Sequence, residues 1–163
     1  MTDSPLAHTD RSGHARMVDV SQKAVTLREA VARARVRMTN EAMHAIQAGD
    51  LPKGEVLATA RIAGIQAAKR TSELIPMCHP LPLTLVEVSV ETDSQLPGVR
   101  IEALVRCEAR TGVEMEALTA ASVAALTVVD MAKSADRWMT VEGVELVRKE
   151  GGKSGALERP AGR

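Results

Sequence analysis

Three stretches of the chain alternate between apolar and polar residues, as half-buried β-strands do. Residues 30–38 carry alanine, valine and methionine on one side and arginines on the other, and residues 86–91 and 99–108 alternate aliphatic with polar side chains. Turn-forming residues at 93–98 join the last two stretches, so we expect an antiparallel hairpin there. A fourth strand is expected at 144–149. For the first stretch a helical alternative stays open, with an apolar stripe through Leu27, Ala30, Val31 and Ala34.

Three other segments carry helical signals. Thr39 and Asn40 are suited to cap a short helix that runs through Ile46 and stops at Gly49. A second helix is expected from residue 54 to about 74, with Pro76 after its end, and a third, strongly apolar one over about 115–135. The order β-α-β-β-α-β, with one small extra helix, predicts a ferredoxin-like α+β domain whose antiparallel sheet is covered by helices.

These elements form one predicted domain over residues 17–155. Residues 1–16 and 156–163 are rich in glycine, proline, serine and charge, and we expect them to be disordered tails. The first of them lacks the apolar run of a signal peptide. The longest apolar run, residues 120–129, is too short to span a bilayer. The expectation is therefore a buried helix in a soluble, cytoplasmic protein.

The amino-acid composition bears on the binding partners, on the cysteine chemistry and on the kind of core that we expect. Lysine plus arginine and aspartate plus glutamate number 21 each, so no overall field draws the protein to nucleic acid or to a membrane. The two cysteines have no CxxC partner, which argues against a disulfide framework or a zinc finger. There is no Phe or Tyr and one Trp, so the core is built from aliphatic residues and methionine. Alanine-rich helices bury little area per residue, and contacts between subunits are expected to add the missing burial.

Asp130 and Lys133 are the most informative charged pair, because they follow a long apolar stretch of the third helix. Three positions apart, they project from the same helix face. They are either a surface ion pair of little energetic value or a partly buried pair that donates and accepts protons. The apolar sequence before them favours the second interpretation.

Two further segments place reactive side chains beside structural breaks. Glu114 and Glu116 stand near a helix start, where carboxylates favourably meet the helix dipole; alternatively, one of them accepts hydrogen bonds from the N–H edge of a guanine- or pterin-like ring. Cys78 and His79 lie in a proline-bounded loop. A Cys–His dyad and a zinc site are both poorly supported, since adjacent extended residues point apart and further ligands are lacking. A rigid loop that lines a ligand pocket fits better.

These segments resemble one family closely, the cyclic pyranopterin monophosphate synthases of molybdenum cofactor biosynthesis. The resemblance covers residues 17 to 155 and rests on long ungapped blocks. The blocks are Met17–Ser21, Lys53–Gly54, Ala58–Thr71, Leu74–Leu81, Thr111–Leu126, Asp130–Met131, Lys133 and Gly151–Gly155. Met77 before Cys78, and the Arg137–Trp138 region, depart from the family's usual residues without affecting the chemistry.

The resemblance implies a ferredoxin-like subunit in a homohexamer, a trimer of dimers, with the active site at a subunit interface. The substrate would be a cyclised GTP derivative, 3′,8-cyclo-7,8-dihydroguanosine triphosphate, which becomes cyclic pyranopterin monophosphate with loss of diphosphate. By resemblance, Asp130 and Lys133 are the catalytic acid and base. The residues expected to bind the substrate are Arg28, Lys53, Lys69, Met77, Cys78, His79, Glu114, Met115, Glu116 and Lys149.

The residue types agree with that chemistry. Ring opening and closure need several general acids and bases held together, and loss of diphosphate needs cations around the leaving group. No electron changes hands, so no redox cofactor is expected, and no residue is assigned as a metal ligand. A non-catalytic ferredoxin-like module that senses a nucleotide is the alternative. An RNA-binding version would carry stacking aromatic residues on its central strands, and residues 84–91 and 99–110 contain none.

Overall fold

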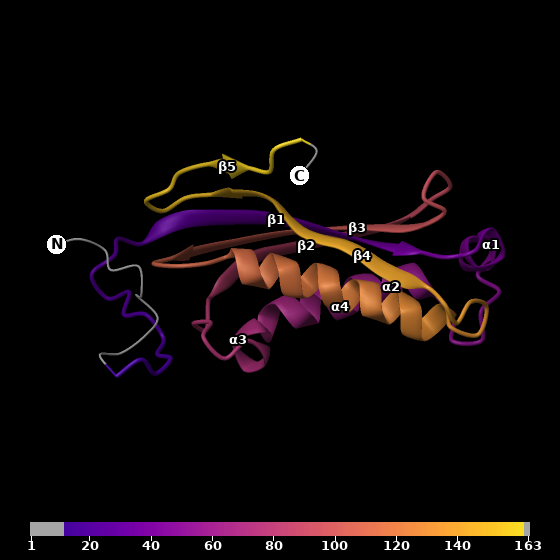
Figure 1. Ribbon diagram of the computed structural model, residues 1–163, viewed down its shortest axis with the longest axis horizontal. Coiled ribbons are helices and arrows are strands. Elements are labelled where there is room, and N and C mark those ends of the chain that lie inside the picture. The colour runs from indigo at the N-terminus through magenta and orange to yellow at the C-terminus, as the bar shows by residue number, and fades with distance from the viewer. Residues whose placement is uncertain (1–11, 162–163) are drawn as a thin grey trace.

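The computed structural model describes residues 12–161, and its four long strands form one antiparallel sheet (Figure 1). The strands are β1 (Thr26–Arg37), β2 (Leu83–Asp93), β3 (Gly98–Ala109), β4 (Thr140–Glu150) and the two-residue β5 (Leu157–Glu158). Their order in the sheet is β2-β3-β1-β4-β5. With two helices crossing one face, this is the ferredoxin-like α+β arrangement that the sequence predicted.

The helices are α1 (Asn40–Ala48), α2 (Val56–Lys69), α3 (Thr71–Leu74) and α4 (Glu114–Ala132). The predicted boundaries of α1 are confirmed, because the Thr39 side chain accepts a hydrogen bond from the Ala42 amide at 3.2 Å and Gly49 adopts a left-handed conformation. The expected helix 54–74 is interrupted instead. Helix α2 ends at Lys69 because Arg70 leaves helical geometry (φ −112°, ψ 12°), and the buried Thr71 hydroxyl, at the start of the short α3, donates to the Ala67 and Ala68 carbonyls.

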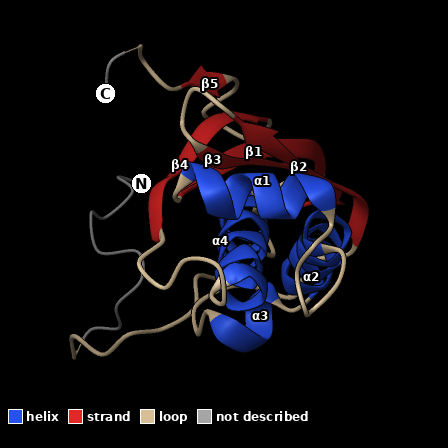
Figure 2. Ribbon diagram, turned by 90° about the vertical axis from the view of Figure 1, so that its right-hand side faces the viewer, coloured by secondary structure: helices blue, strands red, loops and turns tan. Residues whose placement is uncertain are grey.

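Residues 30–38, for which a helix had stayed open as an alternative, lie mostly in strand β1, so the prediction of a strand is confirmed. Ala30, Ala32, Ala34 and Val36 are at most 1 % exposed and lie on the sheet face that α2 and α4 cover (Figure 2). The strand begins at Thr26, four residues before the alternation becomes visible in the sequence. The predicted hairpin of β2 and β3 is confirmed, with Asp93 paired to Gly98 across the turn.

The described part of the C-terminal segment pairs with the sheet. Arg148 and Lys149 of β4 lie opposite β5, and the Arg159 amide donates to the Val147 carbonyl at 2.8 Å. Residues 157–159 of the segment expected as a tail are therefore bonded to the sheet edge. The tail predictions for residues 1–11 and 162–163 lie outside the described residues.

Alanine allows α4 to pack closely on the sheet and on α2. Six alanines of α4 are fully buried: Ala117, Ala120, Ala121, Ala124, Ala125 and Ala132. On α2, a Cβ atom added to Gly64 would lie 3.0 Å from the Ala120 carbonyl oxygen. By length and composition α4 could cross a membrane, and it extends beyond the predicted run at 120–129. More than half of it is buried inside the protein, however, as in the core helix of a soluble domain.

Replacing Gly64 with valine should destabilise the protein. The added methyl groups would collide with the backbone at Ala120 and with Ala124, so the two helices must move apart. We expect the free energy of unfolding to fall by about 1–3 kcal/mol, the usual effect of overpacking, in denaturant unfolding followed by circular dichroism. Gln66→Val on the exposed side of α2 is the control and should be nearly neutral. Equal stabilities of the two variants would contradict the tight contact.

Candidate active site

The predicted site residues gather at the two ends of α4. Asp130 and Lys133 meet Lys53 at its C-terminal end, and we call these three residues the C-terminal cluster. Glu114 and Glu116 lie at its N-terminal end with Arg28, Cys78 and Lys149, and we call these five residues the N-terminal cluster. Glu114 and Asp130 are 16 positions apart. At about 1.5 Å of rise per residue, the two clusters of one chain are separated by about 24 Å.

The C-terminal cluster centres on the carboxylate of Asp130. The ammonium groups of Lys53 and Lys133 donate hydrogen bonds to its two oxygens at 2.6 and 2.8 Å. Lys53 comes from the loop before α2, so this contact joins two elements that are far apart in sequence. The three side chains border a hollow of about 560 Å³, to which Arg137 also contributes.

This cluster is exposed in the single chain, so the expectation of a partly buried Asp–Lys pair is wrong. The side chains of Lys53, Asp130 and Lys133 are 46 %, 56 % and 58 % exposed. In the last turn of α4, Met131 and Ala132 face the core, which leaves positions 130 and 133 on the outer side. The hydrogen bonds from Lys133 and then Lys53 lower the pKa of Asp130 to about 2. Asp130 is therefore a carboxylate at neutral pH.

The N-terminal cluster is more enclosed. The Lys149 ammonium donates to Glu114 Oε1 at 2.6 Å, and the two side chains are 20 % and 28 % exposed. Burial acts to raise the pKa of Glu114, but the hydrogen bond from Lys149 and the charges of Lys149 and Arg28 outweigh it, so this pKa is lowered overall. Glu114 is thus held as an anion that pairs α4 with β4.

Glu116, two residues further on, has the opposite electrostatic character. Glu116 is only 4 % exposed. Burial raises the pKa of its carboxyl group, and the nearby charge of Glu114 adds to this effect. Burial and the nearby charge of Glu116 likewise raise the pKa of Cys78. Cys78 is therefore a thiol at neutral pH, which argues against a thiolate nucleophile.

Arg28 fixes the entrance to α4 by bonding to backbone carbonyls. Its guanidinium donates to the carbonyls of Ala109, Arg110 and Gly112 at 2.9, 3.0 and 3.4 Å. Gly152 packs against it so closely that an added Cβ would lie 2.7 Å from Nη1. Three of the five N–H groups of Arg28 thus hold the turn before Glu114. The sequence resemblance indicated a substrate ligand and gave no sign of this positioning role.

A hollow of about 820 Å³ opens beside Arg28, Glu114 and Lys149. Several of its lining residues were not singled out as site residues from the sequence: Asp19, Gln22, Lys23, Arg110, Thr111 and Ser154. Arg110 donates to the Ser21 carbonyl at 2.5 Å and also to the Lys23 carbonyl, so it ties the segment before β1 to the site. The resemblance at Met17–Ser21 was the signal that pointed to this segment.

The remaining candidates lie around the same end of the molecule. Met77 and His79 are half-buried in the loop next to Cys78, and Met115 is 37 % exposed at the start of α4. Lys69, exposed at the end of α2, borders a separate hollow with Leu81 and Leu83. Within residues 12–161, no three His, Cys, Asp or Glu side chains are grouped closely enough to hold a metal ion.

Glutamine substitutions at the two glutamates should change stability in opposite directions. The pKa of Glu116 lies above its ordinary 4.5 in the folded protein, so the wild type loses stability as pH rises above 4.5. Glu116→Gln should therefore raise the melting temperature at pH 7 and match the wild type below pH 4. The pKa of Glu114 is lowered, so its stabilisation is present above 4.5 and lost as pH falls through the folded value.

Glu114→Gln is thus the matched control and should lower the melting temperature at pH 7. Thermal unfolding of the three proteins between pH 3 and pH 8 checks both signs. A shift of the same sign for both variants at pH 7 would contradict the assigned environments.

Comparison with known proteins identifies the family. Residues 17–152 match the model of the MoaC family. A cyclic pyranopterin monophosphate synthase of Nostoc sp. is 60 % identical over 96 % of this chain and 93 % of its own length. Proteins of the same name from Roseiflexus sp. and Brucella ovis are 61 % and 56 % identical, over 93 % and 96 % of this chain and 96 % of each relative. This chain therefore belongs to the MoaC family.

Proposed function

We propose that this protein is a cyclic pyranopterin monophosphate synthase. It would convert 3′,8-cyclo-7,8-dihydroguanosine triphosphate to cyclic pyranopterin monophosphate and diphosphate, an early step of molybdenum cofactor biosynthesis. Support comes from membership of the MoaC family and from relatives of that name that match nearly the whole chain. The structural observation that carries the proposal is the pair of charged clusters at the two ends of α4.

In this proposal the C-terminal cluster moves protons. Asp130 stays ionised and holds the ammonium of Lys133 in place through the hydrogen bond between them. Lysine suits a general acid and base because its pKa responds to its surroundings. Lys53, on the other oxygen of Asp130, is placed to contact a phosphate.

The N-terminal cluster would bind the substrate. Lys149 and Arg28, with Lys23 and Arg110 at the same hollow, offer cations to the triphosphate. Glu116 is buried and has a raised pKa, so it can exchange hydrogen bonds with the N–H edge of the guanine-derived ring. His79, Cys78, Met77 and Met115 would line the ring's binding surface, and Lys69 would reach the site from α2.

One chain cannot bring these two sets of groups to the same ring atoms. A general acid must reach its proton at about 3 Å, whereas the clusters lie about 24 Å apart along α4. A two-fold axis through the middle of α4, near Ser122, would set the C-terminal cluster of one copy beside the N-terminal cluster of the other. The active site would then lie between two subunits.

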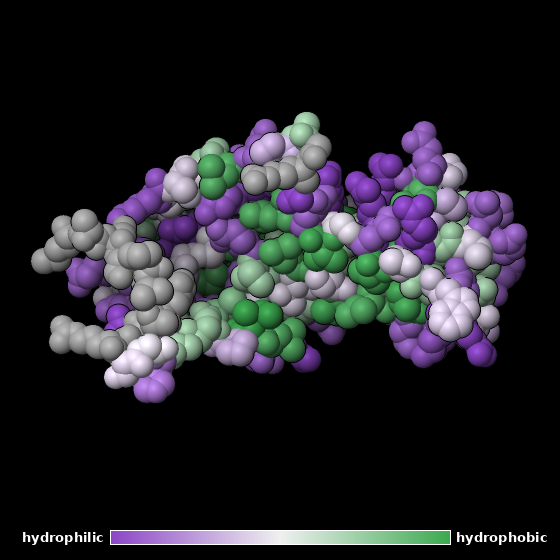
Figure 3. Space-filling view, viewed as in Figure 1, coloured by the Kyte–Doolittle hydropathy of each residue, from purple (hydrophilic) through white to green (hydrophobic). Residues whose placement is uncertain are grey.

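The surface around α4 supports such a contact. An apolar band runs over α4 and β4 in the middle of the face shown in Figure 3. Leu126 of α4 is 59 % exposed and Val144 of β4 is 42 % exposed. Burying these side chains on a second copy removes apolar area from water. We propose that such dimers assemble further into a homohexamer, a trimer of dimers, in the cytoplasm, with no role for nucleic acid or membrane.

Replacing Lys133 with alanine should remove catalysis and leave the fold intact. The side chain is exposed, so no core packing is lost, whereas loss of a general acid–base group costs about 10²–10⁴-fold in rate. Diphosphate release from the cyclised triphosphate measures the effect. Lys133→Arg keeps the charge without an accessible neutral form, so it should also be inactive. Lys133→Ala that keeps more than about a tenth of the wild-type kcat contradicts the role, and a wild type that binds without turnover would indicate a sensor.

Mixing two inactive variants should restore activity if the site is shared between copies. Lys133→Ala damages one cluster and Lys149→Ala the other, so a mixed dimer has one doubly damaged site and one intact site. When the copies pair at random, about half of the dimers are mixed, and each mixed dimer has one intact site out of two. We therefore expect about a quarter of the wild-type diphosphate release. The two proteins are unfolded together, refolded and assayed.

The matched control mixes Lys133→Ala with Lys53→Ala, whose lesions fall in the same cluster. That mixture should stay inactive, because each site contains one damaged residue whichever copies pair. Equal activity of the two mixtures would show that the clusters do not act across a subunit boundary.

A further inference from the structure

Thr26 borders the hollow of about 820 Å³ beside the N-terminal cluster, and the sequence did not single it out as a site residue. It is the first residue of β1 and pairs with Ala109 of β3. Arg28 follows two positions later and borders the same hollow, so both side chains belong to one face of the strand. The start of β1 thus supplies two neighbouring polar side chains to this hollow.

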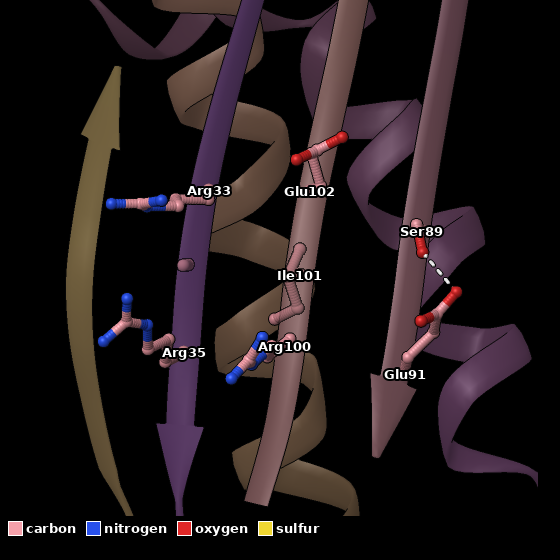
Figure 4. Close-up of a pocket in the computed structure, with 8 residues that line it drawn as sticks. Arg33, Arg35, Ser89, Glu91, Arg100, Ile101 and Glu102 are labelled. Carbon is pink, nitrogen blue, oxygen red and sulfur yellow. Dashed lines mark hydrogen bonds between the residues drawn. The ribbon is translucent and has the colours of Figure 1, made fainter. Parts of the chain in front are cut away.

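The Thr26 hydroxyl is buried and lacks a hydrogen-bond partner. Its Oγ1 atom is shielded from solvent, and within residues 12–161 no group donates to it or accepts from it. Other hydroxyls of the chain are bonded. The buried Thr71 hydroxyl donates to two carbonyls of α2, and even the exposed Ser89 donates to Glu91 at 3.0 Å (Figure 4). Because a buried hydroxyl without a partner is unfavourable, we expect Thr26 to bond to something outside the fold.

The charges around the hollow indicate the chemistry of that ligand. Basic side chains outnumber the two carboxylates that line it: Lys23, Arg28, Arg110, Lys149 and Lys153. One of those carboxylates, Glu114, is already paired with Lys149 at 2.6 Å. The remaining charge is positive, which favours an anion. Phosphoryl oxygens carry negative charge and accept hydrogen bonds from hydroxyls.

We propose that Thr26 is a substrate-binding residue whose hydroxyl donates a hydrogen bond to a phosphoryl oxygen of the cyclised triphosphate. The identity of this ligand rests on the proposed function. The hydroxyl and the methyl group of threonine share one Cβ atom, so a rotation about χ1 between staggered positions moves the hydroxyl out of its shielded position. Binding would then supply the partner that the hydroxyl lacks in the free protein.

Thr26 differs from the neighbouring donors because its hydroxyl has no structural bond to lose. Arg28 donates three hydrogen bonds to backbone carbonyls, and Lys149 donates to Glu114. Arg110 donates to two carbonyls of the segment before β1. A ligand must share these groups with the fold, whereas the Thr26 hydroxyl bonds to it without breaking another contact. Its contribution should therefore appear in substrate affinity and not in stability.

Thr26→Val tests this role, since valine keeps the branched shape and removes the hydroxyl. We expect KM for the cyclised triphosphate to rise about 10- to 100-fold, the usual effect of losing a hydrogen bond to a charged group. The value of kcat should stay within about twofold, because a contact made equally in the bound substrate and the transition state changes KM alone. Without ligand, the melting temperature should be unchanged or higher. Thr26→Ser keeps the hydroxyl and should keep the wild-type KM.

Thr71→Val is the matched control, because the Thr71 hydroxyl is also buried but is bonded to carbonyls. This variant should lower the melting temperature and leave KM unchanged. A Thr26→Val protein with the wild-type KM would overturn the proposal. So would one whose melting temperature falls as far as that of Thr71→Val, since the Thr26 hydroxyl would then be bonded within the fold.

Calorimetric titration with inorganic triphosphate needs no turnover, so it separates this inference from the proposed function. The wild type should bind the probe about tenfold or more tightly than Thr26→Val does. That difference, in a wild type that releases no diphosphate from the cyclised triphosphate, would refute the enzyme and leave the Thr26 contact standing. Equal affinities of the two proteins, with diphosphate release intact, would refute the Thr26 contact alone.

Discussion

The contact of α4 with the sheet and with α2 is the constraint on which the rest of the structure depends. With no phenylalanine or tyrosine, the protein fills this layer with alanines that are completely buried, and Gly64 lets α2 approach the backbone of α4. Such a core tolerates little added volume. It also holds the 19-residue helix α4 against the sheet, which sets the separation of the charged side chains at its two ends. Large apolar side chains such as Leu126 and Val144 nevertheless stay exposed on this chain.

The two ends of α4 differ in ways that follow from their surroundings. At the C-terminal end Asp130 lies on the outer side of the helix, exposed between two lysines. At the N-terminal end the loop at residues 77–79, the strand β4 and the segment before β1 close around the helix, so Glu116 is buried and Glu114 needs Lys149. If the exposed C-terminal cluster of one copy met the enclosed N-terminal cluster of another, the pocket between them would hold both the proposed acid–base groups and the proposed binding groups.

Arg28 shows how the fold determines the chemistry of a neighbour. Its guanidinium donates hydrogen bonds to the carbonyls of residues 109, 110 and 112, and these bonds hold the turn before Glu114. From that turn Glu114 accepts the hydrogen bond of Lys149. The same rigid turn places Glu116 inside the protein. Two carboxylates two residues apart thus receive pKa shifts of opposite sign. A charged residue at a site can therefore act by holding the backbone as well as by touching a ligand.

The sequence by itself determined the elements and the family. Period-two alternation identified β1 and the β2–β3 hairpin, and Thr39 and Gly49 marked the ends of α1, because these signals are local. Motif blocks around Cys78, Glu114 and Asp130 indicated the chemistry. Tertiary structure alone decided that Asp130 and Lys133 are exposed, that α2 ends at Lys69 and that Arg28 bonds to carbonyls. It also separated the candidate residues into two clusters about 24 Å apart. Burial and distance depend on which elements pack together, and spacing along the chain does not contain that information.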